Sequence, residues 1–492
     1  MNKQQDLLRQ LGLYGLVATG VCSMMGASIN VVPFMIQRNV AGIGPYVLPA
    51  FMVAAIPALL AAMAYAALAS AMPRAGGSYI YASRGLHPYL GFIGSFSQWF
   101  GLSFVIGVIA YIVVPFMRDI CIAMDLDDLS AFLEVGWVRI AIALSLIWIY
   151  VFINIRGVTI YEKTLVPLMF LMFILGGIVV YAGFSFDHSD FSSALLQREG
   201  RTILTQSPSF EWKTFFSAAA LMFSSFIGFD AIAQAGGEAR QPSRNLPRAI
   251  ILAITIVGAF YFLFTAAVYH AVPWSFIAEE AMDKDISAPG LLSYLLPSWA
   301  SVLILLGATI ALINDLPAML LSVSRLVFAW ARDGVFPRGM AVVHKRNKTP
   351  HMALIVCGVI ASLGVLGCHF AGDFFLGVDI MLTSMMVNFL LMCVTLFCIP
   401  HLNPKLAEKM TVFQSSYARW LVGGLGALLI TALLILHTLK DMQKSVEAWY
   451  YHSTWIWLIV MGIGSFIFWR RYTQLKTSGV DLEKLFNELP EE

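Results

Sequence analysis

Apolar stretches long enough to cross a membrane occupy most of this chain. A transmembrane helix needs about 20 apolar residues, and soluble proteins carry roughly 25% charged residues. The 492 residues here are 59% hydrophobic and only 12% charged. Twelve candidate spans lie at approximately 12–36, 45–71, 89–117, 136–155, 161–184, 214–235, 248–272, 298–331, 351–370, 374–399, 418–438 and 453–472. We therefore predict an all-α polytopic membrane protein with twelve transmembrane helices.

Two of these segments, the first and the sixth, are interrupted by small and polar residues, at 20–30 and 223–230. Such residues let a helix unwind, and the freed backbone groups are tolerated in a membrane only around a buried polar cavity. Paired interruptions in two halves of a chain point to a transporter's substrate site. We therefore predict a five-plus-five inverted repeat, with helices 1–5 in residues 1–184 and helices 6–10 in 185–400. Helices 11–12 and a cytoplasmic tail then occupy 401–492.

The charged residues orient the predicted spans. When the N-terminus is placed in the cytoplasm, most of the 31 Lys and Arg residues fall on the cytoplasmic side. The acidic runs at 125–128 and 279–285 then fall outside. This distribution follows the positive-inside rule, and an even number of spans returns the C-terminus to the cytoplasm. We expect a multi-pass protein of the plasma membrane with both termini cytoplasmic.

Other functional classes find little support in the sequence. The net charge is only +2 with no basic tail, so we expect no nucleic-acid partner. The histidines are scattered, and no HExxH or paired-aspartate motif is present, which argues against an intramembrane enzyme. The six cysteines form no metal-type CxxC pair, and we interpret them as free thiols. We predict no catalytic site, metal or cofactor. A non-transporting sensor stays open as an alternative, and uptake into liposomes would distinguish it.

Three stretches together resemble the amino acid–polyamine–organocation (APC) superfamily of permeases. PRAGGSYIY at 73–81, preceded by 57–65, is similar to the end of that family's second span and the loop after it. EARQPSRNLPRAI at 238–250 is similar to the basic inner loop after the sixth span. The third stretch begins at Ser324-Arg325, includes ARDGVFP at 331–337 and ends at Thr349-Pro350, and it resembles the eighth span and the loop after it. The resemblance implies a LeuT-type fold and alternating-access transport of an amino acid or a related amine.

The resemblance also implies that residues 26–29 stand at the family's small-residue break, which is usually Gly-x-Gly. Physical chemistry points to the same place, because a half-helix beginning near Gly26 presents unpaired N–H groups to a substrate carboxylate. Carbonyl groups near 224–227 then accept hydrogen bonds from the substrate ammonium. Close helix packing is the alternative role for Gly26. The predicted substrate-binding residues are Met25, Gly26, Ala27, Ser28, Ile29, Ile106, Phe223, Ser224, Ser225, Phe226, Ile227, Asp315 and Met319.

Relatives often carry a bulky aromatic residue in the sixth break, where this chain has Ser224 or Ser225. A serine in its place enlarges and wets the pocket, so a larger or more polar substrate is accepted. The alternative is that Phe223 or Phe226 supplies the ring from a neighbouring position.

Two acidic residues, Asp230 and Asp315, lie in the interior of predicted spans, whereas Glu162 and Asp379 lie near span ends. An acid in the interior of a span costs about 2.5–3.5 kcal/mol and marks a functional site by default. Asp315 precedes Pro317, which frees a backbone carbonyl, so we expect an irregular stretch that borders a cavity. Its three candidate roles are ligand for a substrate amine or cation, structural hydrogen-bonding group, and proton site. For Asp230 the resemblance implies gating or proton coupling, with helix capping as the alternative.

Three alternatives stay open for the energy coupling of transport. They are a sodium site at Ser322 or Ser324, proton coupling, and uncoupled exchange.

The sequence thus predicts a secondary active transporter of amino acids that works by alternating access. The alternative is a carrier of polyamines or other organic amines, in which Asp315 and Asp230 bind the substrate cation. The expected partners are the small-molecule substrate and the lipid bilayer. At the cytoplasmic surface, Arg332 and Asp333 are predicted to form an ion pair that changes during gating.

Overall fold

The computed structural model describes residues 7–203, 209–371, 375–446 and 448–490, and within these ranges the chain is helical and forms no β-sheet. Eleven helices among the described residues are long and apolar enough to cross a membrane. These helices confirm the predicted all-α polytopic class. The first predicted segment is not among the eleven, because it is divided into shorter helices. The twelve-helix count, the inverted repeat and the domain boundaries stay predictions.

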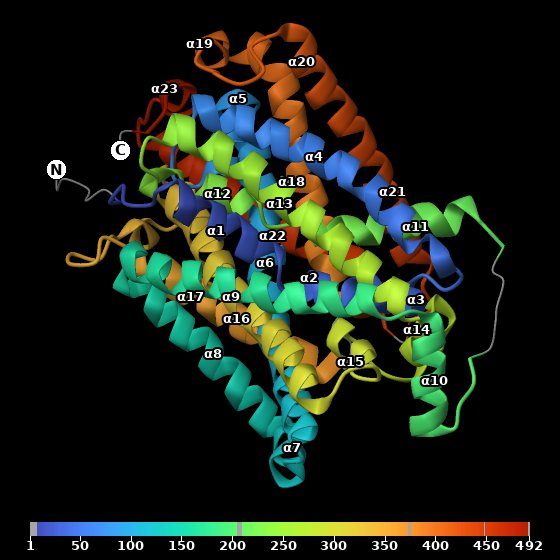
Figure 1. Cartoon of the computed structure of the whole chain (residues 1–492). Coiled ribbons are helices and arrows are strands. Elements are labelled where there is room, and N and C mark those ends of the chain that lie inside the picture. Colours follow the sequence, from blue (N-terminus) through green and yellow to red (C-terminus); the bar gives the residue numbers. More distant parts are fainter. Residues whose placement is uncertain (1–6, 204–208, 372–374, 447, 491–492) are drawn as a thin grey trace.

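The unbroken long helices are α4 (Val47–Ala71), α6 (Pro88–Ala123), α8 (Gly136–Arg156), α9 (Val158–Ser185), α13 (Pro242–Ala271), α16 (Ser298–Arg332), α17 (His351–Ala371), α18 (Phe375–Leu402), α21 (Gly426–Gln443) and α22 (Ser453–Thr477). The shorter helices between them are α5 (Gly77–Gly85), α7 (Asp127–Glu134), α10 (His188–Glu199), α14 (Trp274–Asp283), α15 (Ala288–Leu292), α19 (Pro404–Ala407), α20 (Ser416–Trp420) and α23 (Leu482–Asn487). Figure 1 shows the bundle that they form.

Both predicted interruptions are present in the structure. The first segment is divided into α1 (Leu13–Met24), α2 (Ala27–Asn30) and α3 (Val32–Asn39). The sixth is divided into α11 (Trp212–Met222), a 3-10 turn at Phe223–Phe226 and α12 (Asp230–Gln234).

The two interruptions lie directly against each other. Gly228 has a φ of +134°, and a Cβ atom built on it would lie 2.5 Å from the carbonyl carbon of Ser23 and 2.8 Å from the Met24 nitrogen. The Tyr261 hydroxyl donates a hydrogen bond to the Met24 carbonyl. A freed carbonyl at the end of α1 therefore finds its partner inside the protein, as a broken helix in lipid requires.

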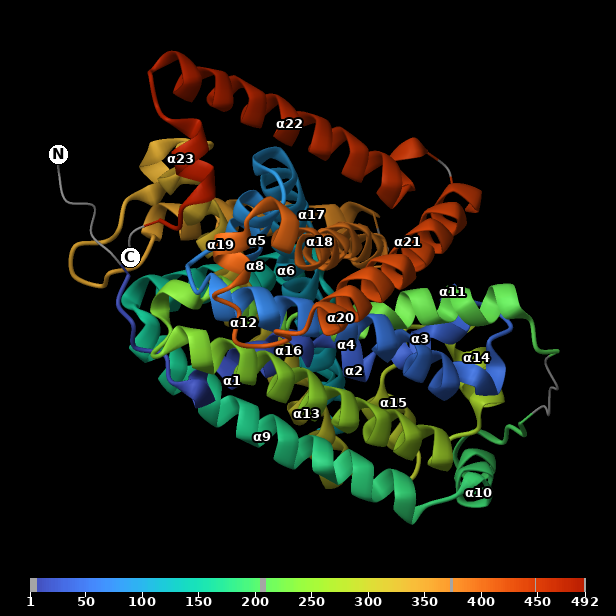
Figure 2. The same ribbon diagram turned by 90° about the horizontal axis from the view of Figure 1, so that it is seen from above.

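Helices α6 and α16 form the centre of the bundle. Helix α6 contacts α16, α17 and α18, and α16 also contacts α1 and α9. Helix α22 lies at the edge (Figure 2).

The predicted irregular stretch around Asp315 is wrong, because α16 runs unbroken through Pro317 from Ser298 to Arg332. Helices α1, α6 and α9 pack on α16, and the Asn154 amide donates a 3.4 Å hydrogen bond to the Pro317 carbonyl.

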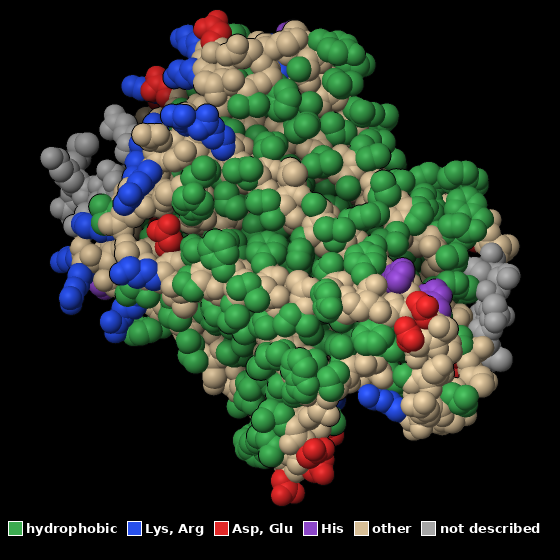
Figure 3. Space-filling view, viewed as in Figure 1, with side chains coloured by type: hydrophobic (Ala, Val, Ile, Leu, Met, Phe, Trp, Pro, Cys, Tyr) green, Lys and Arg blue, Asp and Glu red, His purple; other side chains and the backbone are tan. Residues whose placement is uncertain are grey.

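The surface is divided into apolar and charged regions. Apolar side chains cover the middle of the face shown in Figure 3. Lysine and arginine side chains gather at the left of that view, beside the two ends of the chain, and acidic side chains gather at the opposite side, over α7 and near α10. An apolar band between two charged ends is the arrangement expected of a protein that spans a bilayer.

Replacing Gly228 with alanine tests the contact between the interruptions. Gly228→Ala adds a Cβ atom that meets the Ser23 backbone and must adopt a left-handed φ, a strain of about 1–3 kcal/mol. We expect a lower unfolding midpoint for the purified protein in detergent. Gly462→Ala in α22, where nothing lies within 4 Å of the added atom, is the control and is expected to leave the midpoint unchanged or raise it. An unchanged midpoint in Gly228→Ala would contradict this contact.

Candidate substrate site

A cavity of about 30 Å³ lies between the two interrupted segments and helices α6, α16 and α18. A volume of 30 Å³ holds about two water molecules, so substrate entry requires these helices to move apart. The lining is apolar except for Ser224 and Asp315, and it consists of Val32, Val105, Val108, Ile109, Ile112, Ser224, Ile227, Asp315, Met319, Val378 and Met381.

The Asp315 carboxyl group occupies the place at the first break where a substrate carboxylate was expected. A Cβ atom built on Gly26 would clash with an Asp315 carboxylate oxygen and would lie 2.9 Å from its Cγ atom. Asp315 is only 2% exposed. Within the described part of the chain, its Oδ1 atom has no hydrogen-bond partner. Gly26 is therefore small because the acid from α16 needs its space.

The sixth break contributes fewer side chains to the cavity than the sequence predicted. Ser224 and Ile227 line it, and the Ser224 hydroxyl donates a 2.7 Å hydrogen bond to the Leu221 carbonyl. Phe223 and Phe226 do not line it. The Phe223 ring packs on Phe389, and the Phe226 ring packs on Phe51 and Tyr261. Ser225 is buried, and its hydroxyl has no partner among the described residues. Neither phenylalanine supplies a ring to this cavity.

The remaining predicted binding residues are dispersed. Met25 and Ile29 line a second, separate cavity of about 20 Å³ against α9, α13 and α16. Ile106 is buried in α6 but lies outside both linings, whereas Met319 lines the first. The side chains of Ala27 and Ser28 lie outside the described part of the structure. Substrate binding by Ala27 and Ser28 stays a prediction.

Asp230 is the second buried acid, and it belongs to a network of neutral hydrogen-bonding groups. Its carboxylate accepts hydrogen bonds from the Gly228 N–H, at 3.1 Å, and from the Gln98 side-chain amide. The Gln98 oxygen accepts in turn from the Ser78 hydroxyl at 2.6 Å and from the Asn388 amide at 3.1 Å. The network joins the start of α12 to α5, α6 and α18, so Asp230 fixes the sixth segment to three other elements.

A buried ion pair closes the side of the bundle that holds the chain ends. The Arg325 guanidinium contacts both Glu238 carboxylate oxygens, at 2.5 and 3.0 Å, and neither side chain is more than 1% exposed. The Ser324 hydroxyl accepts a 2.8 Å hydrogen bond from Arg325 and donates to the Leu321 carbonyl. The Ser322 hydroxyl is buried without a partner in the described ranges. Ser324 therefore lies beside a cation rather than in an open oxygen cluster.

A second buried pair on the same side joins α5 to the end of α16. The Arg84 guanidinium lies 2.6 Å from the Asp333 carboxylate, which also accepts a 2.7 Å hydrogen bond from the Tyr79 hydroxyl. The structure gives Asp333 a partner that the sequence did not predict, Arg84 of α5. The role of Arg332 in gating stays a prediction. Neighbouring residues on a helix point in different directions, whereas α5 brings Arg84 to face the acid.

The C-terminal segment covers this second pair. The Arg84 guanidinium donates a 3.4 Å hydrogen bond to the Glu488 carbonyl, and Arg74 donates a 2.8 Å hydrogen bond to the Pro490 carbonyl. The Phe486 ring of α23 lies 5.5 Å from the Arg84 guanidinium carbon. Residues 486–490, which we call the tail segment, are therefore bound to the same arginine as Asp333.

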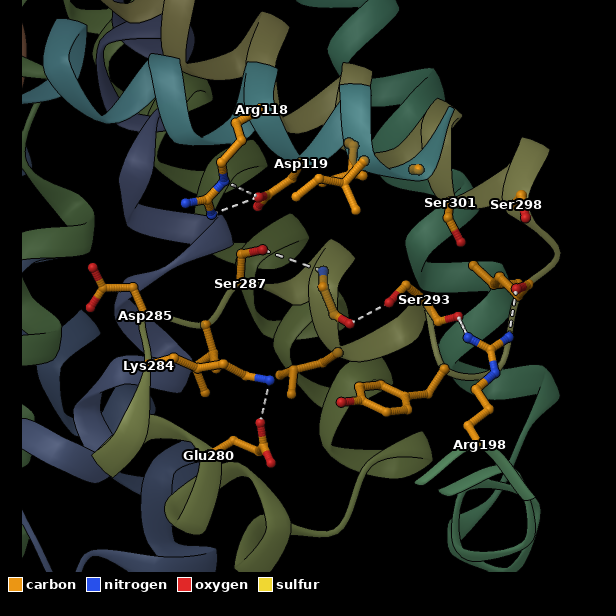
Figure 4. A pocket seen from close by; sticks show the side chains of 18 of the residues that line it. Arg118, Asp119, Arg198, Glu280, Lys284, Asp285, Ser287, Ser293, Ser298 and Ser301 are labelled. Carbon is orange, nitrogen blue, oxygen red and sulfur yellow. Dashed lines mark hydrogen bonds and ion pairs between the residues drawn. The ribbon is translucent and has the colours of Figure 1, made fainter. Parts of the chain in front are cut away.

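A larger pocket of about 610 Å³ opens at the opposite, acidic side of the bundle. Figure 4 shows its mixed charges, supplied by the end of α6, by α10 and by α14. Lys284 lies 2.6 Å from Glu280, and Arg118 lies 2.7 Å from Asp119. Just outside this pocket, Arg201 also contacts Glu280, at 2.6 Å. Of these pairs, only Arg201–Glu280 joins separate elements, namely the segment after α10 and helix α14.

Sequence reasoning missed part of the lining and one ion pair. The lining residues outside the predicted set are Val32, Val105, Val108, Ile109, Ile112, Val378 and Met381. They are apolar residues at ordinary helical spacing, and no sequence signal separates them from packing residues. For the ion pair a signal existed, because Glu238 and Arg325 are opposite charges inside two motifs that resemble one family.

Comparisons with known proteins place this geometry in context. The profile of a family described as "Amino acid permease" matches residues 11–466. The branched-chain amino acid permease BcaP of Bacillus subtilis is 26% identical over 387 residues, which cover 73% of this chain and 75% of that protein. Mouse (Mus musculus) cationic amino acid transporter 4 is 26% identical over 388 residues, 73% of this chain and 55% of that protein. The low-affinity putrescine importer PlaP of Escherichia coli is 25% identical over 348 residues, 69% of each chain.

Removing one partner of the Arg325–Glu238 pair tests its contribution. Glu238→Gln leaves the buried guanidinium without its counter-charge, which costs about 3–5 kcal/mol for a buried pair. We expect a large fall in the unfolding midpoint, and the double variant Glu238→Gln/Arg325→Met is expected to recover part of it. Glu134→Gln, which breaks an exposed pair with Arg118, is the control and is expected to cost about 0–1 kcal/mol. Equal effects of the two single variants would contradict this interpretation.

The outer ion pairs give stability a defined pH dependence. Burial alone raises the pKa of Glu280, but hydrogen bonds from Lys284 and Arg201 outweigh it, and the net pKa lies below its ordinary value. The pKa of a glutamate in the unfolded chain is about 4.3. Because the pKa of Glu280 is lower in the folded protein, its ionised carboxylate stabilises the fold at pH values above about 4.3. This stabilisation is lost as the pH falls through the pKa of Glu280 in the folded protein. We expect the unfolding midpoint of wild type to exceed that of Glu280→Gln at pH 7. The difference should shrink below about pH 4, and a constant difference would contradict the assignment.

Proposed function

Because the chain belongs to the amino acid permease family, we propose that it is a secondary active transporter that moves amino acids or related amines by alternating access. The family and its relatives are permeases and transporters, not enzymes. One observation carries the proposal. Two interrupted helices meet at a small buried cavity that holds a carboxylate without a counter-charge, between two faces that are each closed by polar contacts.

Alternating access requires contacts that open on one side while the other side stays closed. On the side of the chain ends, the pairs Arg325–Glu238 and Arg84–Asp333 join separate elements. On the opposite side, Arg38 of α3 lies 2.8 Å from Asp285, which follows α14. We assign the first set to an inner gate and the second to an outer gate. The cavity lies between the two gates, and its small volume fits a conformation in which both are closed.

The charge distribution supports an orientation. The basic side of the molecule, at the left of Figure 3, is the side on which the N-terminal and C-terminal segments lie. The positive-inside rule assigns this side to the cytoplasm. We therefore propose a protein of the plasma membrane with both termini cytoplasmic, so that the inner gate faces the cytoplasm.

Purified protein in liposomes tests the transport function. We expect wild type to accumulate at least one radiolabelled solute among leucine, arginine and putrescine above empty liposomes. Imposed proton or sodium gradients, or preloaded unlabelled solute, will distinguish the three coupling alternatives. A sensor without transport activity would accumulate none of them under any condition, and that result would overturn the proposal.

The position of Gly26 supplies a variant for the same assay. A leucine there would displace the Asp315 carboxyl group, because even a Cβ atom clashes with it. We expect Gly26→Leu to lose uptake by at least tenfold while the protein still inserts and purifies. Gly462→Leu, at an open position of α22, is the matched control and should keep uptake. Normal uptake by Gly26→Leu would mean that the first break is not part of the substrate path.

A further inference from the structure

We infer that Asp315 takes the place of a substrate carboxylate, so that the substrate is a small aliphatic amine with no carboxylate on the carbon that bears the amino group. This inference rests on the proposed transport function and names its substrate class. It differs from the sequence expectation, in which a zwitterion places its own carboxylate at the first break.

Asp315 lies against the first break. The acid extends from the middle of α16 to the first break, and its Cγ and Cβ atoms would lie 2.9 and 3.1 Å from a Cβ atom on Gly26. These distances show that the Asp315 side chain packs directly against Gly26 and fills the space on that side of the break. A substrate carboxylate brought to the same place would also meet a like charge, which disfavours the ionised form of both groups. The site thus excludes the group that all α-amino acids share.

The surroundings of Asp315 call for a positive charge. It is the only charged residue in the lining, and its Oδ1 atom has no hydrogen-bond partner in the described part of the chain. The other polar lining residue, Ser224, already donates its hydroxyl proton to the Leu221 carbonyl. A buried carboxylate without compensation is costly. An ammonium group supplies both the missing charge and the missing donor.

The rest of the lining describes the body of the substrate. Val105 and Ile109 of α6, Met319 of α16 and Met381 of α18 surround the acid with aliphatic and thioether groups. Methionine side chains adapt to substrates of different shape. No second acid lines the cavity among the described residues. A molecule with one ammonium end at Asp315 and an aliphatic chain fits this chemistry.

Matched pairs of ligands test the inference on the wild-type protein. We would measure dissociation constants in detergent by calorimetry for leucine against 3-methylbutylamine, lysine against cadaverine, and arginine against agmatine. Each pair differs by the α-carboxylate alone. We expect at least one decarboxylated member to bind at least tenfold more tightly than its amino acid. If each amino acid binds as well as or better than its amine, or if no amine binds, the inference is overturned.

Substitution of the acid provides the second arm. Asp315→Asn keeps the shape and removes the charge, so we expect amine affinity to fall at least tenfold. Asp315→Ala also frees the space beside Gly26. We therefore expect the ratio between the dissociation constants of an amino acid and its amine to become smaller. Asp128→Asn, on the exposed helix α7, is the control and should change neither affinity. If Asp315→Asn binds amines as tightly as wild type, the inference is overturned. This outcome can be read from Asp315→Asn alone, so it does not depend on whether Asp315→Ala folds.

Failure of this inference is distinct from failure of the transport proposal. If wild type accumulates amino acids in liposomes but binds amines no better, the transporter stands and the role of Asp315 falls. If amines bind with the expected preference but no solute is accumulated, the amine site stands and transport falls. Loss of every ligand in Asp315→Asn, with the amino acid and amine reduced equally, assigns Asp315 a structural or proton-carrying role and overturns the inference.

Discussion

The structure depends on one constraint, which is that a backbone group freed inside a membrane must find a partner within the protein. The chain interrupts two helices and places the interruptions in contact, so that each covers the other. Gly228 lies against the Ser23 backbone, and Tyr261 reaches across to the Met24 carbonyl. A single broken helix would have no such partner. The cavity exists because two breaks meet, and the helices around it are held by this meeting.

Within that cavity the electrostatics are set by a single residue. The backbone at a break can recognise either end of a zwitterion, so the break alone does not choose a substrate. We infer that Asp315 makes the choice, because its carboxyl group lies beside Gly26, at the break whose backbone N–H groups would otherwise be offered to an anion. The family relationship indicates transport of amino acids or amines. The position of one carboxyl group is the basis for our inference about which group the site attracts.

The broad architecture was readable from the sequence because hydropathy and small-residue interruptions act locally. Span positions and the two breaks followed from short stretches, and so did the burial of an acid at Asp315. The particular neighbours did not. Phe223 and Phe226 were expected beside the substrate, yet their rings face other helices, because the 3-10 turn changes the direction of successive side chains. Pro317 was expected to disturb α16, but packing on both sides keeps the helix intact. The partner of Asp333 lies on another helix, and no local pattern reveals a tertiary contact of that kind.

The tail segment has a consequence for the order in which this protein can be assembled. Arg84 contacts Asp333 and the Glu488 carbonyl, and the chain between Arg84 and Glu488 spans 404 positions. Synthesis at roughly 5–20 residues per second inserts the early helices long before the last ones exist. The side of the bundle around Arg84 therefore stays incomplete until the tail segment has left the ribosome. Until then, the Arg84 side chain, which is buried in the finished protein, lacks the cover of the tail segment. The closed face around Arg84 is therefore completed only after residues 486–490 have been synthesised.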